Sequence, residues 1–91
     1  MLEKIKLVLR FDDDEFDGDI GETIEAAKAD LELCGVDKNK INETDPLILR
    51  AIKTFCKAEF STDIKEAERY RKSYESIRDH MTLSKDYTEV T

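Results

Sequence analysis

The side chains whose types and spacing most resemble a binding site are acidic residues close to the N-terminus. With the glycine and isoleucine among them, their order matches positions 1, 3, 5, 6, 7 and 8 of a calcium-binding EF-hand loop: Asp13, Glu15, Asp17, Gly18, Asp19 and Ile20. That loop also needs a glutamate at position 12 to close the coordination sphere, and this chain has Ile24 there. The segment is therefore predicted to be a solvated acidic loop leading into a helix, whose N-terminal dipole favours nearby carboxylates.

The other reactive side chains are few and scattered. Cys34 and Cys56 fall on apolar helical stripes, which predicts that both thiols pack as small hydrophobic groups. His80 stands alone, so the sequence supports neither a zinc site nor a Cys–His nucleophile pair. Because no Ser–His–Asp set, phosphate loop or apolar carboxylate pair is visible, we expect no enzyme activity, catalytic residue, metal or cofactor.

Aromatic and basic side chains occur together near the C-terminal third. Tyr70 and Tyr74 lie among arginines, a combination that can hold single-stranded nucleic acid, but glutamates interleave with them. The formal charge of -7 also disfavours general attraction to phosphates, and ten of the acids fall within residues 11–33 against one lysine. This excess is interpreted either as a solubilising face or as a surface that repels DNA or docks a basic partner.

The elements that must position these residues are helices. With 91 residues, three Gly and one Pro, the chain is expected to be one all-α domain, a small bundle of about four helices with a central apolar third helix. Residues 2–10 predict a first amphipathic helix with Lys6 on its polar side. After the acidic stretch of residues 11–21, apolar positions recur from Phe16 to Cys34, and Gly35 ends this second helix.

The third and fourth helices have clear start signals. Asp45 and Pro46 predict an N-cap and a first helical residue, after which the widest apolar stripe follows: Leu47, Ile48, Ala51, Ile52, Phe55, Cys56 and Phe60. Asp63 and Glu66 match a capping box. The fourth helix then carries a charged face with helix-spaced ion pairs around apolar positions, which are Ile64, Ala67, Tyr70, Tyr74, Ile77 and Met81.

The predicted domain organisation is a helical domain over residues 1–82 and a polar tail over residues 83–91. Leu83, Tyr87 and Val90 have no regular spacing in this tail. The two cysteines form no disulfide framework, and no apolar leader or membrane span is visible. We therefore expect the protein in a reducing cytoplasm.

Three segments in succession resemble the gp6-like head-tail connector family of tailed bacteriophages and prophages. They are residues 24–31 (IEAAKADL), 45–52 (DPLILRAI) and 70–77 (YRKSYESI). The resemblance implies a non-catalytic subunit of a ring of about a dozen copies. Such a ring lies beneath the portal, completes the head after DNA packaging and provides the DNA exit channel.

The same resemblance implies the partners and the location. The partners are copies of the chain, the portal protein and a downstream neck or tail completion protein. DNA passes through without sequence-specific binding, and no membrane is involved. The subunit is expected in the neck of the virion after assembly in the host cytoplasm.

Two sets of residues are candidates for contacts in such an assembly. The acids expected to line the DNA channel are Asp12, Asp13, Asp14, Glu15, Asp17 and Asp19. The residues expected to dock on the portal or a neighbouring subunit are Leu83, Tyr87 and Val90, with Tyr87 folding back onto the fourth helix as the alternative. The competing function is a small acidic cytoplasmic regulator that binds a basic protein partner.

Overall fold

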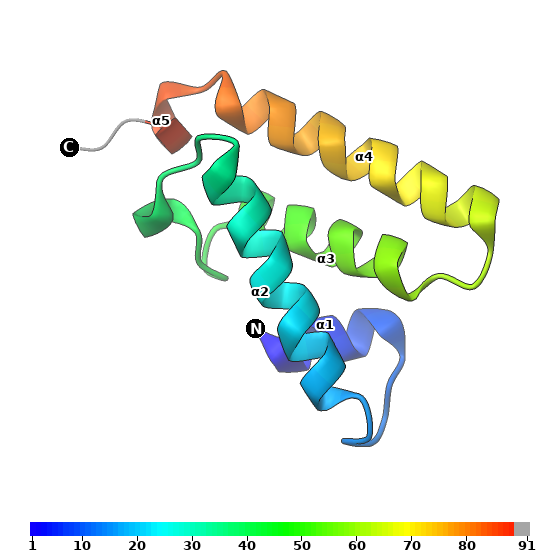
Figure 1. Ribbon diagram of the computed structural model, residues 1–91. Helices are drawn as coiled ribbons and strands as arrows, with labels where there is room; N and C mark the ends of the chain where they lie inside the picture. Colours follow the sequence, from blue (N-terminus) through cyan, green and yellow to red (C-terminus); the bar gives the residue numbers. More distant parts are fainter. Residues whose placement is uncertain (89–91) are drawn as a thin grey trace.

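The computed structural model describes residues 1–88, which form a helical bundle measuring 40 × 26 × 19 Å (Figure 1). Its elements are α1 (Leu2–Leu9), α2 (Asp17–Leu33), the 3-10 helix η1 (Lys38–Lys40), α3 (Pro46–Phe60), α4 (Ile64–Thr82) and α5 (Lys85–Thr88). No strand occurs in this described part of the chain, so the all-α prediction is confirmed.

α3 is the central helix, and it packs against α1, α2 and α4. It begins as predicted, because Asp45 Oδ1 accepts hydrogen bonds from the backbone N–H groups of Leu47 (2.9 Å) and Ile48 (3.3 Å). Pro46 occupies the first turn, where its missing N–H costs nothing. Its fully buried side chains, Ile48, Ala51, Ile52 and Cys56, form the middle of the core with those of α2.

Several aromatic residues lie nearer the surface than predicted. Phe16 is 38% exposed, because it lies before the first residue of α2 and not on the buried side of that helix. Its ring stacks on Phe11, with ring centroids 5.1 Å apart. Phe55 and Phe60 are only partly buried at the edge of the core. Ile64, predicted on the apolar stripe of α4, is almost fully exposed, because it is the first residue of that helix.

α2 ends in a hydrogen-bond pattern that favours glycine. Gly35 has a φ of 112°, its N–H donates to the carbonyl of Glu32, and the N–H of Val36 donates to the carbonyl of Leu31. Both Val36 and Leu31 are buried. The prediction that Cys34 packs in the core is wrong, because this last residue before the turn is exposed.

α1 ends in the same pattern without a glycine. Arg10 adopts a left-handed conformation with a φ of 63°, and the N–H of Phe11 donates to the carbonyl of Lys6. A left-handed conformation costs a residue with a Cβ atom about 1–2 kcal/mol. This turn reverses the chain so that the acidic segment leads back to α2.

The start of α4 has only half of the predicted capping box. Asp63 Oδ1 accepts from the N–H groups of Lys65 (2.9 Å) and Glu66 (3.3 Å), as an N-cap should. The Glu66 carboxylate accepts a hydrogen bond from the Tyr70 hydroxyl at 3.0 Å. The N–H of Asp63 donates instead to the Ser61 hydroxyl.

The segment after α4 folds back on the bundle through Tyr87. The backbone carbonyl of Tyr87 accepts from the N–H of Asp37 at 2.7 Å, and its hydroxyl donates to Asp45 Oδ1 at 3.2 Å. Tyr87 therefore folds back on its own subunit, as the alternative prediction had it, but its hydrogen bonds reach the connection between α2 and α3 and not α4. Val90 lies outside the described residues.

Candidate interaction surfaces

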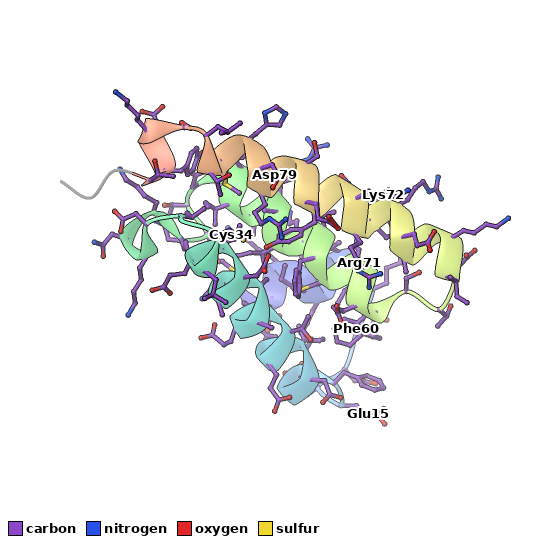
Figure 2. All side chains as sticks on the ribbon, turned by 45° about the horizontal axis from the view of Figure 1, so that its top comes forward. Glu15, Cys34, Phe60, Arg71, Lys72 and Asp79 are labelled. Carbon is purple, nitrogen blue, oxygen red and sulfur yellow. The ribbon has the colours of Figure 1, made fainter. Side chains whose placement is uncertain are left out.

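The acidic segment lies at the end of the molecule opposite α5 (Figure 1), and Glu15 marks its tip (Figure 2). Asp12, Asp13 and Glu15 are exposed, and none of them forms an ion pair with any of residues 1–88. Within the segment, Asp13 accepts a hydrogen bond from the N–H of Glu15. These three acids, all predicted to line a channel, are thus available to a partner or solvent.

Two of the other acids are used inside the subunit by Lys6. This lysine is only 6% exposed, whereas the sequence placed it on the polar side of α1. Its Nζ lies 3.0 Å from Asp14 Oδ1 and 2.9 Å from Asp17 Oδ1. Lys6 therefore ties the acidic segment and the first turn of α2 to α1.

The titration of this cluster follows from its ion pairs. The Asp17 and Asp14 carboxylates hold the pKa of Lys6 above its ordinary value, against the smaller opposing effect of burial. In return, the hydrogen bond and charge of Lys6 lower the pKa of Asp14. Lys6 and Asp14 therefore stay charged across the neutral range.

Asp19, the remaining candidate acid, is already within α2. Its side chain is exposed, and with Asp17 it lies in the first turn, where the helix dipole favours negative charge. No group of three or more His, Cys, Asp or Glu side chains positioned for a metal ion occurs within residues 1–88.

α4 carries exposed bases that find no partner within the described chain. The prediction of helix-spaced ion pairs on this helix is wrong, because its ion pairs all belong to Arg78, which binds Asp30 on α2 and the adjacent Asp79. The bases that form no ion pair with residues 1–88 are Lys65, Arg69, Arg71 and Lys72. Arg71 and Lys72 are labelled along this helix in Figure 2.

The tyrosines of α4 stabilise the bundle and are poorly placed to stack on bases. Tyr74 is 3% exposed and packs edge-on against Phe55, with ring centroids 5.0 Å apart. Tyr70 is half-buried, its hydroxyl is bound to Glu66, and the Lys57 ammonium lies 5.5 Å from its ring centroid. This arrangement does not favour the single-stranded nucleic acid reading.

A polar network joins α2 to α4. Asp30 Oδ2 accepts hydrogen bonds from the Tyr74 hydroxyl at 2.5 Å and from Arg78 Nη1 at 3.1 Å. Burial, with help from the Asp30 carboxylate, raises the pKa of Tyr74. The network connects the C-terminal halves of two helices that otherwise meet little.

The two thiols differ in exposure. Cys56 is fully buried, as predicted, and burial with the nearby charge of Glu59 raises its pKa to about 12. Cys34 is exposed at the end of α2. The two cysteines are therefore distinguishable by chemical labelling.

Large apolar side chains are exposed at several points. Leu83, one of the predicted docking residues, is 86% exposed, and so is Leu33. Leu7 and Ile64 are each 79% exposed. Leu33 and Leu7 were not predicted as surface residues, but both fall off the apolar period of their helices, and that position is the sequence signal of their exposure.

Comparison with known families decides what kind of protein this is. A family model described as phage connector protein matches residues 1–88. The chain belongs to the phage connector protein family. No curated protein and no solved structure gives a significant match.

Membership confirms the predicted connector resemblance and a structural role among the phage head and tail proteins. As a connector, this chain is expected to work through its surfaces, and those with unsatisfied charge or exposed apolar groups lie on α1, the acidic segment, α2 and α4. None of the helices described for this connector is long and apolar enough to cross a membrane.

Proposed function

We propose that this connector is a subunit of a ring of about a dozen copies beneath the phage portal. The ring completes the head after DNA packaging and provides the channel through which DNA leaves. Membership of the connector family across residues 1–88 is the observation that carries this proposal. The site of action is the virion neck, after assembly in the host cytoplasm.

The exposed apolar side chains support assembly with other proteins. Leu7, Leu33, Ile64 and Leu83 are large hydrophobic groups that remain largely in contact with water in the single subunit. Covering them with neighbouring copies, the portal or a downstream neck protein removes that apolar surface from water. Of the predicted docking residues, Leu83 remains exposed in the single subunit. Tyr87, in contrast, is already bound to the α2–α3 connection of its own subunit.

The acidic segment supports a role at the DNA channel. Asp12, Asp13 and Glu15 are exposed and unpaired among the described residues, so their field repels phosphates. DNA slides past a surface of like charge, whereas lysines would bind it and release counterions. The proposal therefore assigns channel contact to these three acids, while Asp14 and Asp17 hold Lys6.

The ring is tested by native mass spectrometry and negative-stain microscopy of the protein, alone and mixed with the portal protein of the same phage. Closed rings that bind the portal are expected. A protein that stays monomeric and does not bind the portal protein, yet binds a basic host protein, would favour the alternative function as a small acidic regulator.

The channel is tested in phage with Asp12→Lys, Asp13→Lys and Glu15→Lys together, which we expect to slow DNA ejection. The control carries three reversals outside the segment, at exposed Glu3, Glu59 and Glu68. Equal ejection rates in both phages would remove these acids from the channel.

A further inference from the structure

Two helix sides that the bundle leaves uncovered have the same spacing of exposed residues. The α2 face consists of Asp19, Glu22, Ala26, Ala29 and Leu33. The α4 face consists of Arg69, Lys72, Ser76, Asp79 and Leu83. Successive members are three, four, three and four residues apart in both sets, so each set follows one side of its helix.

The chemistry of the two faces is complementary when they are compared from their N-terminal ends. Asp19 and Glu22 correspond to Arg69 and Lys72, short side chains follow, and a leucine closes each face. Both faces span the same number of residues, about 21 Å of helix. Only helices that run in the same direction match in this way, because the opposite direction would set acids against a leucine.

The single subunit does not satisfy either face. All ten residues are exposed, so neither face covers the other within one molecule. Asp19, Glu22, Arg69 and Lys72 form no ion pair with residues 1–88. Asp79 is the one charged member of the two faces that has an ion-pair partner among residues 1–88: Arg78 of the same subunit lies 3.5 Å from it. This arginine offsets the charge of Asp79, whose counterpart on the α2 face is the uncharged Ala29.

We infer that the α2 face of one copy packs against the α4 face of a second copy, with the two helices parallel. This contact rests on the proposed ring and identifies the surfaces that build it. The charge pairs fix partner and direction, while Leu33 and Leu83 lose their exposed apolar surface. Each copy keeps one face for the next neighbour, and such head-to-tail contacts form a ring when the rotation closes.

Charge reversal on each face tests the pairing. One variant carries Asp19→Lys and Glu22→Lys, and the other carries Arg69→Glu and Lys72→Glu. Each sets like charges opposite one another, so we expect self-association at least tenfold weaker by sedimentation velocity, and few rings with or without the portal protein. The variant with all four substitutions is expected to assemble again.

Mixing the two reversed variants is the sharpest measurement. One has two basic faces and the other has two acidic faces, so an equimolar mixture should assemble by alternation although neither variant assembles alone. Matched controls carry the same charge changes at residues outside both faces and outside the acidic segment: Glu3→Lys with Asp86→Lys, and Arg50→Glu with Lys53→Glu. These controls are expected to associate like the unaltered protein.

The outcomes separate the contact from the proposed function. Rings that form equally well in every variant, or a mixture that does not recover, would overturn the α2–α4 contact while leaving the ring intact. An unaltered protein that forms no ring, alone or with the portal protein, would overturn both.

Discussion

Replacing Tyr74 with phenylalanine tests how α2 and α4 are held together. The substitution removes one hydroxyl and keeps the buried ring that packs on Phe55. That hydroxyl donates to Asp30 at 2.5 Å, and a hydrogen bond to a charged acceptor contributes about 1.5–3 kcal/mol. The Asp30 side chain is 34% exposed and keeps its bond to Arg78, so water replaces part of the loss.

The expected cost of Tyr74→Phe is therefore at the lower end, about 1.5 kcal/mol. For a domain of this size, the melting temperature should fall by about 6–12 °C. Circular dichroism during urea and thermal unfolding measures both. Tyr70→Phe is the matched control on the same helix: its hydroxyl binds Glu66 one turn away at the surface, and we expect a clearly smaller loss of stability than for Tyr74→Phe.

The pH dependence gives a second measure of the same group. The pKa of Tyr74 is raised in the folded protein, so the unfolded chain ionises first, near pH 10. Its stabilisation is present below that pH and is lost as the pH rises toward the folded pKa. The unaltered protein should therefore lose stability above pH 10 more steeply than Tyr74→Phe. A phenylalanine variant with unchanged melting temperature and the same alkaline slope would refute the reasoning.

Three further predictions follow from local geometry. In the native protein, a thiol reagent should label exposed Cys34, whereas Cys56, with its pKa near 12, should react only on unfolding, as mass spectrometry of the labelled protein will show. Arg10→Gly should raise stability by about 0.5 kcal/mol in urea unfolding, because glycine relieves the left-handed strain but gains entropy in the unfolded chain. Lys6→Met should lower the urea midpoint far more than Lys4→Met, because it leaves a buried carboxylate oxygen without its cation.

The sequence was sufficient wherever a local rule determines the structure. Asp45 with Pro46, Asp63 and Gly35 each mark a helix boundary through hydrogen bonds to residues at most a few positions away. The central position of α3 also followed from its wide apolar stripe.

The errors came where distant contacts decide the outcome. Lys6 is polar by type, and its burial depends on acids 8 and 11 residues later that the fold brings back to it. Cys34 fits the apolar period, but its helix ends there and nothing covers it. Tyr87 lies in a four-residue helix too short to show a period, and its partner Asp45 is 42 residues away.

The candidate surfaces were partly predictable. Composition located the acidic segment, but only the ion pairs separated Asp12, Asp13 and Glu15 from the acids that hold Lys6. The sequence did not predict that bases of α4 would be unpaired, because acids lie at helical spacing from them and suggested ion pairs along the helix. Side-chain positions, not spacing, decide whether such pairs form.

The network at Asp30 has a consequence for the curvature of an assembly. It links α2 to α4, the helices that carry the two faces proposed to meet neighbouring copies, and so it helps to hold the angle between those faces. In a ring of about a dozen copies each subunit turns by about 30° from the last, and a change of a few degrees adds or removes a copy. If the proposed ring forms, one carboxylate inside each subunit would thereby influence the diameter of its central opening.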